Sequence, residues 1–464
     1  MNQSLLDHEL VRLEAFEPAG TAIELSARDL LGHTLVLGGT GAGKTTCVIQ
    51  PILNQLIQSS VEPGIGLCIL DTKSDGEAQA FLQAAVFAVD RDRDLSMIAV
   101  DSDYCLDLLE PLRTESLEGA SRLAETLSYL VPECSTNRFW EVTFRSLLRH
   151  TFRLFLLLGH EIKYSEFVGF IADYLLRFDT DEGSFKGLET LLETLHEDGT
   201  IDAPKEVVHE TRSMHMMWEK LDWRTRTNLQ SMAAPLVGLL NQSAAKRLFS
   251  EGTPICLAGA VNTGGIVLLS IDSIREPEVA RLAGTLFKAR YYDAILGRRI
   301  GAMNPLSVLI MDDWVQSASQ GTGTRYSDAD ALSIMRSRHG CIVSAAQGLA
   351  GLDLAIGPYS RKAVLANFAN LFFFRSRDSE LDAIAAAYLG QKVETLKDSA
   401  VYEKGLAALR RQAPVEYHRE IRVPAVPQGA LARLPTGEAY ALIGGQSYNQ
   451  PISFIPHHAI QEQE

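Results

Sequence analysis

The feature that most constrains the fold of this chain is a glycine-rich stretch near its start. Residues 38–45, GGTGAGKT, fit the pattern G-x-x-x-x-G-K-[ST]. An apolar run, His33–Leu37, precedes the stretch, and a helical pattern, Lys44–Gln58, begins within it. A phosphate-binding loop needs this context, because its backbone N–H groups turn around a phosphate at the N-terminus of a helix. The stretch therefore predicts a nucleotide-binding α/β domain.

Most positions of the stretch have a chemical role in such a loop. Glycines let successive N–H groups turn inward, the Lys44 ammonium reaches the β- and γ-phosphates, and the Thr45 hydroxyl ligates Mg²⁺. We therefore expect ATP and Mg²⁺ as cofactors. The alternative is an ordinary glycine-rich turn before a helix. The expected nucleotide contacts are Gly38, Gly39, Thr40, Gly41, Ala42, Gly43, Lys44, Thr45 and Thr46.

A loop of this type also needs an acidic residue on a neighbouring strand. The apolar run Val308–Met311 leads directly into Asp312 and Asp313. At the strand end, Asp312 is placed to hold the magnesium together with Thr45, and Asp313 to polarise the attacking water. The alternative is a pair of surface acids after a buried strand. Hydrolytic motors usually carry Glu at the second position, and Asp is shorter by a methylene. The sequence therefore predicts ATP binding more firmly than ATP hydrolysis.

Short apolar runs alternate with helical patterns in two parts of the chain. Long helical patterns, such as Pro277–Leu296, separate the runs. Buried strands alternating with helices are typical of a mostly parallel sheet that is covered on both faces. The runs are His33–Leu37, Gly66–Leu70, Met97–Val100, Ile266–Ile271, Leu306–Met311, Gly340–Ala345 and Asn370–Phe374.

The middle of the chain has a different pattern. From Thr114 to Leu229 there is almost no strand signal, whereas apolar residues recur at helical spacing, as in Arg145–Leu158. We therefore predict three segments. Residues 1–113 hold an N-terminal segment and the first part of the ATPase domain, 114–228 form an inserted all-helical domain, and 229–464 complete the ATPase domain and add a C-terminal β tail.

Charge and apolar content narrow the class of protein. Lys and Arg total 43 against 58 Asp and Glu, a net charge of −15, which excludes a basic nucleosome-like protein but not a local nucleic-acid-binding surface. No apolar run approaches the ~20 residues that span a bilayer, and the N-terminus lacks the apolar core of a secretory signal. The six cysteines have no zinc-type spacing. We expect a soluble cytoplasmic protein with reduced thiols.

Several separate motifs resemble those of the VirD4/TraG-type coupling proteins of type IV secretion and conjugation, which belong to the FtsK/HerA group of motors. GGTGAGKTT continues into VIQPIL, and the family also tends to carry a helix-kinking proline there. LDTKSDGE resembles the family's strand-end D-x-K-G-E, CLDLLEPL its N-P-L turn, and VLIMDD its second acidic motif. Phe139-Trp140 and Arg224–Thr227 resemble the entry to the family's helical insertion and the return from it.

One further stretch, IMRSRHGCIVSAAQGLAGLD, resembles a family motif that completes the site. By that resemblance, Gln347 at a strand end senses the γ-phosphate. Arg336, with Arg338 as second choice, would face the nucleotide of the neighbouring subunit. The implied catalytic residues are Lys44, Asp312, Asp313, Gln347 and Arg336.

The resemblance implies a RecA-like P-loop NTPase domain with an inserted all-α domain, assembled as a ring that we expect to be a hexamer. ATP hydrolysis would drive DNA through the central pore. The helical domain would recognise a relaxase or effector cargo, and type IV secretion channel components would be partners. Coupling proteins usually begin with two membrane helices, and the residues before His33, which we expect to be the first strand, contain none. Any place at the inner membrane would therefore depend on partners.

Two alternatives stay open. The first is a HerA/FtsK-like DNA-processing or defence motor that feeds a nuclease, which the missing membrane helices favour. The second is an ATP-binding switch or adaptor with weak hydrolysis, which Asp313 in place of glutamate favours.

Overall fold

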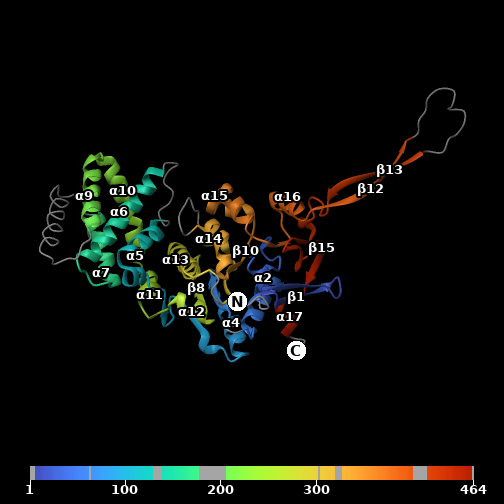
Figure 1. Ribbon diagram of the computed structural model, residues 1–464, viewed down its shortest axis with the longest axis horizontal. Coiled ribbons are helices and arrows are strands. Elements are labelled where there is room, and N and C mark those ends of the chain that lie inside the picture. The colour runs from blue at the N-terminus through green and yellow to red at the C-terminus, as the bar shows by residue number, and fades with distance from the viewer. Residues whose placement is uncertain are drawn as a thin grey trace, which may run out of the picture. The chain divides into compact units, whose positions relative to one another are not determined.

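The computed structural model describes residues 6–61, 64–128, 138–176, 205–300, 304–318, 327–400 and 415–461. The chain forms two compact units, each built from separate stretches of sequence (Figure 1). Unit 1 contains Met1–Ser59, Ile310–Val315 and Gly340–Glu464, and unit 2 contains Ser60–Leu309 and Gln316–His339.

Unit 1 is built on a mixed sheet with the strand order β2-β1-β15-β14-β11-β3-β10. Strand β3 is buried along its whole length and runs parallel to both of its neighbours, β10 and β11, whereas the other pairs are antiparallel. Its strands are β1 (Glu9–Glu17), β2 (Ala22–Ser26), β3 (Thr34–Leu37), β10 (Gly340–Ala346), β11 (Asn370–Phe374), β14 (Glu438–Ile443) and β15 (Gln446–Phe454). The end of β9 (Ser307–Met311) also belongs to this unit.

Two helices of unit 1, α2 and α16, begin at polar caps that satisfy their first N–H groups. Ser26 and Asp29 form a reciprocal capping box, and Asp378 accepts from the N–H groups of Glu380 and Leu381. The helices are α2 (Ala27–Leu30), α3 (Gln50–Gln58), α15 (Leu349–Leu365), α16 (Ser379–Tyr388) and α17 (His457–Gln461).

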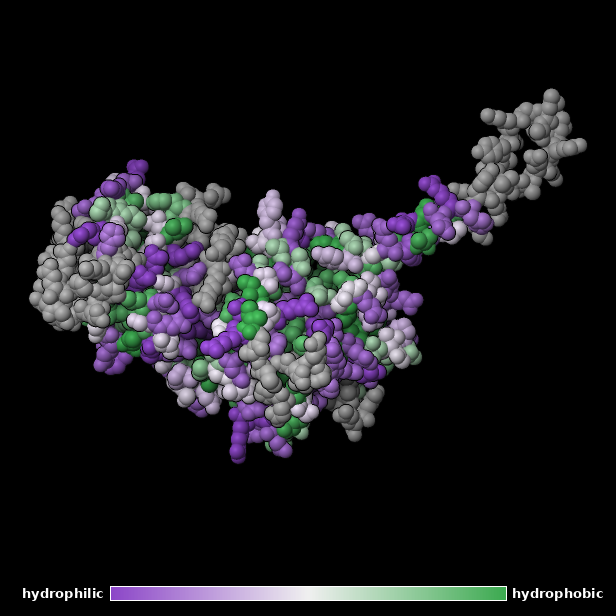
Figure 2. Space-filling view, viewed as in Figure 1, coloured by the Kyte–Doolittle hydropathy of each residue, from purple (hydrophilic) through white to green (hydrophobic). Residues whose placement is uncertain are grey.

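A separate two-stranded hairpin projects from the rest of unit 1 (Figure 1). Its strands, β12 (Gln391–Ala400) and β13 (Val415–Pro424), pair along their whole length. The exposed apolar side chains of Val393 and Leu396 lie on β12, and Figure 2 shows an apolar patch part-way along the hairpin among hydrophilic residues.

Unit 2 has a parallel sheet with the strand order β4-β8-β5-β6-β7. β4 and β8 are buried along their whole length, as expected for parallel strands covered on both faces. The strands are β4 (Gly66–Asp71), β5 (Leu95–Ile98), β6 (Tyr104–Cys105), β7 (Thr253–Pro254) and β8 (Ile266–Ser270). The helices beside them are α4 (Glu77–Phe87), α11 (Ser243–Ser250), α12 (Leu257–Thr263), α13 (Pro277–Leu296) and α14 (Asp328–Met335).

The described residues between 114 and 228 form helices and their connections, and none of them lies in a strand. This confirms the predicted all-helical character of the segment, whereas the boundaries at 113/114 and 228/229 stay a prediction. The helices are α5 (Glu110–Ser128), α6 (Arg138–Leu157), α7 (Tyr164–Ile171), the π-turn η3 (Ala172–Leu176), α9 (Lys205–Lys220) and α10 (Trp223–Leu240). Trp140 lies in α6.

A sharp bend divides α5 near its start. Ser116 has a φ of 51° and a ψ of −118°, which no helix contains. The bend brings Gly119 against Pro111, where an added Cβ would lie 1.8 Å from the Pro111 carbonyl oxygen. A residue with a side chain therefore does not fit at position 119 without a change in the bend.

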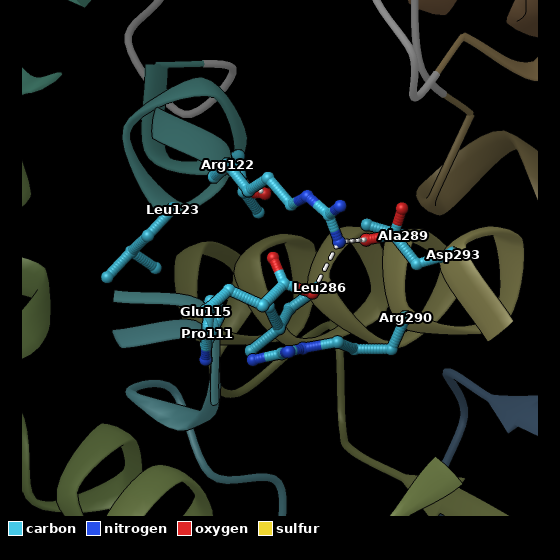
Figure 3. Close-up of a pocket in the computed structure, with 9 residues that line it drawn as sticks. Pro111, Glu115, Arg122, Leu123, Leu286, Ala289, Arg290 and Asp293 are labelled. Carbon is cyan, nitrogen blue, oxygen red and sulfur yellow. Dashed lines mark hydrogen bonds and ion pairs between the residues drawn. The ribbon is translucent and has the colours of Figure 1, made fainter. Parts of the chain in front are cut away.

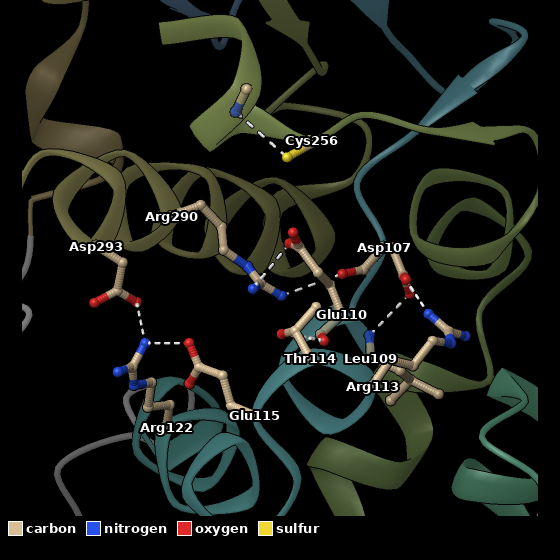
Figure 4. Close-up of polar contacts among 11 residues, drawn as sticks. Asp107, Leu109, Glu110, Arg113, Thr114, Glu115, Arg122, Cys256, Arg290 and Asp293 are labelled. Atoms are coloured by element: carbon tan, nitrogen blue, oxygen red, sulfur yellow. Dashed lines mark hydrogen bonds and ion pairs between the residues drawn. The ribbon is translucent and has the colours of Figure 1, made fainter. Parts of the chain in front are cut away.

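Ion pairs hold both halves of the bent helix to α13 (Figure 4). Arg290 pairs with Glu110 at 2.9 Å before the bend. After the bend, Arg122 pairs with Glu115 at 2.7 Å and approaches Asp293 of α13 at 3.8 Å. The first turn of the helical segment is thus fixed to the longest helix beside the sheet by charge as well as by packing.

Four of these side chains, Glu115, Arg122, Arg290 and Asp293, line a small polar cavity of about 10 Å³, which is room for a single water molecule (Figure 3). A cavity of this size offers no space for an organic ligand. Burial also raises the pKa of the Glu110 carboxyl, and the Arg290 guanidinium acts in the opposite direction.

Most predicted strands are confirmed, and one prediction about their order is wrong. His33–Leu37 is not the first strand, because β1 and β2 precede it and complete the edge of the unit 1 sheet. No described helix is both long and apolar enough to cross a bilayer. The five cysteines among the described residues form no disulfide with one another, and Cys134 lies outside them.

Candidate nucleotide site

The glycine-rich loop leaves the carboxyl end of β3 between two parallel neighbours. The N–H of Gly38 donates to Ala346 O at the end of β10, and the N–H of Gly39 donates to Arg375 O just after β11. Gly43 has a φ of 101°, and an added Cβ would lie 3.0 Å from the Gly437 nitrogen. Glycine is therefore required at position 43 both by its backbone conformation and by the close approach of the C-terminal segment.

The helix that follows the loop does not begin as a regular α-helix. Thr45–Ile49 form a π-turn, η1, in which the Gln50 N–H donates to Thr45 O five residues back. Pro51 stands in the first turn of α3, where its missing N–H needs no partner. The proline expected to kink the helix thus marks the change from π to α geometry.

The Lys44 side chain folds back across the loop. Its ammonium donates to Gly38 O at 2.8 Å and to Gly39 O at 2.9 Å, and the residue is buried. The positive charge therefore stands over the backbone that the motif predicts to wrap a phosphate. Beneath the loop, burial raises the pKa of the Cys47 thiol, so a neutral group packs there.

Thr45 and Asp312 are brought together from positions far apart in the sequence. The Thr45 hydroxyl donates to both carboxylate oxygens of Asp312, at 2.8 and 3.0 Å. Asp312 directly follows β9, as its strand-end position predicted. Hydroxyl and carboxylate oxygens are the ligands that Mg²⁺ prefers, so this pair fits the predicted metal site.

Two more predicted residues lie beside this pair. Asp313 is half-buried in the turn after Asp312, and the next residue, Trp314, packs edge-on against Phe368. The Thr46 hydroxyl reaches Gly43 O at 3.5 Å and so supports the loop backbone.

Gln347 also lies at the loop, as the family resemblance implied. It follows β10, is exposed, and its Oε1 accepts a hydrogen bond from the Thr40 hydroxyl at 3.1 Å. Thr40 and Gln347 therefore face each other at the open side of the loop. Gly41, with a φ of 68°, and Ala42 complete the turn between them and Lys44.

Three residues of this site were missed by the sequence reasoning. The Gly437 N–H donates to Ala42 O at 3.0 Å, and the Thr436 hydroxyl approaches Gly41 O at 3.4 Å, so the segment before β14 supports the loop. Arg375 is half-exposed beside Gly39 and brings a cation to the same edge of the sheet. Its position directly after the NLFFF strand was the available signal.

Arg336 belongs to unit 2. It is exposed at the start of a turn, η5 (Arg336–Arg338), that follows α14. Arg338, the second choice, is half-buried, and its Nε donates to Arg298 O at 3.0 Å within the same unit. Of the two, Arg336 is therefore the one whose side chain is presented to solvent.

A buried arginine just after α13 fixes the end of that turn. Arg298 is only 7% exposed. Burial lowers the pKa of its guanidinium, which stays a cation. The guanidinium donates to six acceptors, namely Asn262 Oδ1, Pro305 O, Arg338 O, His339 O, Val261 O and Ser307 Oγ.

A second buried cation, Lys288 within α13, fixes the start of α14. Lys288 pairs with Asp328, in the first turn of α14, at 2.7 Å, and their side chains are 1% and 0% exposed. The Tyr292 hydroxyl donates to the same Asp328 oxygen at 2.8 Å. Burial lowers the pKa of Lys288, and Asp328 acts in the opposite direction. Together, Lys288 and Arg298 hold both ends of the segment that carries Arg336.

Comparison with known proteins identifies relatives by fold but not by sequence. No protein-family profile and no curated protein sequence matches the chain. Among solved structures, the bacterial conjugative coupling protein TrwBΔN70 in an unbound form has a TM-score of 0.66 at 16% identity, covering 98% of this chain and 90% of that one. TrwB with the ATP analogue ADPNP has a TM-score of 0.64 at 16% identity, covering 98% and 91%. VirB4 of Thermoanaerobacter pseudethanolicus has a TM-score of 0.51 at 14% identity, covering 99% of each chain.

At these identities the likeness establishes the fold. It confirms the predicted fold class, a RecA-like P-loop domain with helices inserted, and it confirms the resemblance to coupling proteins at the level of structure. The likeness does not extend to the roles of individual residues.

Proposed function

We propose that the chain is an ATP-driven motor of the coupling-protein type, which hydrolyses ATP to move DNA or a DNA–protein cargo. The observation that carries this proposal is the contact between the Thr45 hydroxyl and the Asp312 carboxylate at the base of the glycine-rich loop. A glycine-rich turn with a purely structural role does not require a carboxylate from a distant strand beside that hydroxyl.

Each predicted site residue of unit 1 then has a role in binding or hydrolysing ATP. Thr45 and Asp312 would hold Mg²⁺, which supplies charge neutralisation at the transferred phosphoryl group. Lys44 binds the β- and γ-phosphates, Asp313 orients the attacking water, and Gln347 senses the γ-phosphate. Catalysis of this kind depends mainly on positioning and electrostatic stabilisation, so small displacements of these groups are costly.

The fold neighbours support nucleotide and metal binding. TrwB has been solved with ADP and Mg²⁺, with ADPNP, and with the GTP analogue GDPNP. Because this chain has the same fold and the loop chemistry described above, we assign ATP and Mg²⁺ as its cofactors.

The presentation of Arg336 supports a ring. An arginine that acts on a neighbouring subunit must be exposed, yet held by its own subunit, and Arg336 meets both conditions. In a ring, which we expect to be a hexamer in the manner of coupling proteins, Arg336 would complete the next subunit's site. Residues 114–228 would recognise relaxase or effector cargo, DNA would pass through the pore, and type IV secretion channel components would be further partners.

The test is a phosphate-release assay with and without DNA, on wild type, Lys44→Ala and Arg336→Ala. We expect DNA-stimulated turnover in wild type and none in either variant, with ATP binding retained in Arg336→Ala. Mixed Arg336→Ala and Lys44→Ala subunits should recover activity, because some interfaces pair an intact Lys44 with an intact Arg336.

Other outcomes favour the alternatives. Wild-type turnover in Lys44→Ala would refute the assignment of the loop. ATP binding without hydrolysis, in rings shown to contain DNA, would favour the switch or adaptor. Co-purification with a nuclease in place of a relaxase would favour the DNA-processing motor.

A further inference from the structure

A groove in unit 2, lined by none of the residues assigned to ATP, has an apolar floor and an acidic rim. It lies between the end of α4 and β5 and has a volume of about 480 Å³. Its apolar lining is Val86, Phe87, Leu95, Met97 and Tyr104. Phe87 is 79% exposed, which is unusual for a phenylalanine that packs within its own chain.

The rim carries three exposed carboxylates, Asp92, Asp101 and Asp103. Within the part of the chain that the structure describes, none of these carboxylates has a hydrogen-bond or ion-pair partner. Arg91, just before Asp92, pairs with Asp94 and donates to Gly264 O. Three carboxylates line the groove and no Lys or Arg does, so its lining carries net negative charge.

The groove also exposes the edge of a strand. On one side β5 pairs with β8 through all four of its residues, Leu95 to Ile98. On the other side, among the described residues, it pairs with β6 only through Ile98 and Tyr104. The Leu95 N–H donates to Asp92 O, so Ser96 and Met97 are the part of this edge without a strand partner, and an unpaired strand edge is a template for another strand.

We propose that this groove binds an extended peptide segment of alternating apolar and basic residues, which adds to β5 as an edge strand. The backbone of Ser96 and Met97 would form main-chain hydrogen bonds with the segment. Alternate side chains of an extended segment point to opposite sides, so one set would cover Phe87 and Met97 while the other meets the carboxylates of the rim. The proposal does not rest on ATP hydrolysis or on ring formation.

The test is fluorescence anisotropy of the full chain with a short labelled peptide that alternates valine and lysine. Asp101→Asn/Asp103→Asn should weaken binding about tenfold and reduce its salt dependence. Phe87→Ala should weaken binding by a similar factor by removing apolar contact. A peptide with N-methyl groups on alternate backbone nitrogens should not bind, because it cannot pair with the strand edge.

Matched controls separate the groove from general attraction to an acidic protein. Glu161→Gln/Glu166→Gln removes two exposed acids elsewhere in unit 2, and Phe16→Ala removes an exposed aromatic of unit 1; both should bind the peptide as wild type does. A valine–glutamate peptide should not bind. The proposal is overturned if the valine–lysine peptide fails to bind, if the groove variants bind like the controls, or if the N-methylated peptide binds equally well.

Discussion

Replacing Arg298 with lysine would test whether α13 positions the turn that carries Arg336. The guanidinium uses its N–H groups on six acceptors, whereas a lysine ammonium offers three donors from one nitrogen. At least three acceptors would lose their partner, mostly buried carbonyl oxygens. A buried polar group left unpaired costs about 1 kcal/mol or more, so the free energy of unfolding should fall by about 3 kcal/mol.

The expected functional effect follows from which contacts are lost. Arg338 O and His339 O are among the acceptors, so the end of η5 loosens while every residue of the glycine-rich loop keeps its contacts. Turnover should therefore fall, by tenfold or more if Arg336 supplies charge at the transition state, while the Kd for ATP stays unchanged. Urea denaturation, equilibrium ATP binding and phosphate release measure the three quantities.

Mixing of subunits distinguishes a misplaced Arg336 from a general loss of folding in the Arg298→Lys subunit. Lys44→Ala subunits cannot hydrolyse ATP but retain Arg298 and Arg336, so in mixed rings they should restore turnover at the sites of Arg298→Lys subunits. Arg299→Lys, an exposed neighbour, is the matched control and should resemble wild type. The reasoning is refuted if Arg298→Lys loses stability yet hydrolyses ATP normally, or if mixed rings, shown to be mixed, gain nothing.

Further substitutions test other parts of the site and of the fold. Asp313→Ala should trap bound ATP and Asp313→Glu should keep or raise turnover in the phosphate-release assay; normal hydrolysis by Asp313→Ala would place the water-orienting role elsewhere. Arg338→Ala should lower the urea midpoint more than Arg336→Ala, whereas Arg336→Ala should lower turnover without changing that midpoint; the reverse order would exchange their roles. Because the pKa of Glu110 is raised in the folded state, its contribution to stability is greatest when it is protonated and is lost as the pH rises through that pKa. Glu110→Gln should therefore flatten the decrease in urea midpoint as the pH rises above 4.5, and an unchanged pH profile would show that the carboxyl is not buried in solution.

The predictable parts of the molecule are those whose signal is local. β4, β8 and β9 are short runs of consecutive apolar residues, because both faces of each strand are covered. The glycine-rich loop is specified by adjacent residues, and Asp312 by its place directly after an apolar run. Arg336 and Gln347 required a family resemblance, since an arginine on a helix and a glutamine after a strand have no pattern of their own.

The unpredicted parts depend on contacts between distant residues. β1 and the hairpin strands β12 and β13 are largely exposed and rich in charges, so their alternation is weak. Thr436 and Gly437 support a loop that lies almost four hundred residues earlier, as the Thr436–Gly41 separation of 395 shows. Arg298 looks like an ordinary surface charge after a helix, and only the fold reveals that six acceptors surround it.

The residues proposed to bind ATP and the arginine proposed to act on a neighbouring subunit belong to different units. Lys44, Thr45, Asp312 and Gln347 come from three separate stretches of sequence, yet all belong to unit 1. Arg336 belongs to unit 2, whose own Lys288 and Arg298 hold both ends of its segment. A residue that acts on a neighbouring subunit needs support only from its own unit. The residues that bind ATP and the residues that position Arg336 are therefore two separate sets. Substitutions in the two sets should therefore complement each other in mixed rings, whereas two substitutions within one set should not.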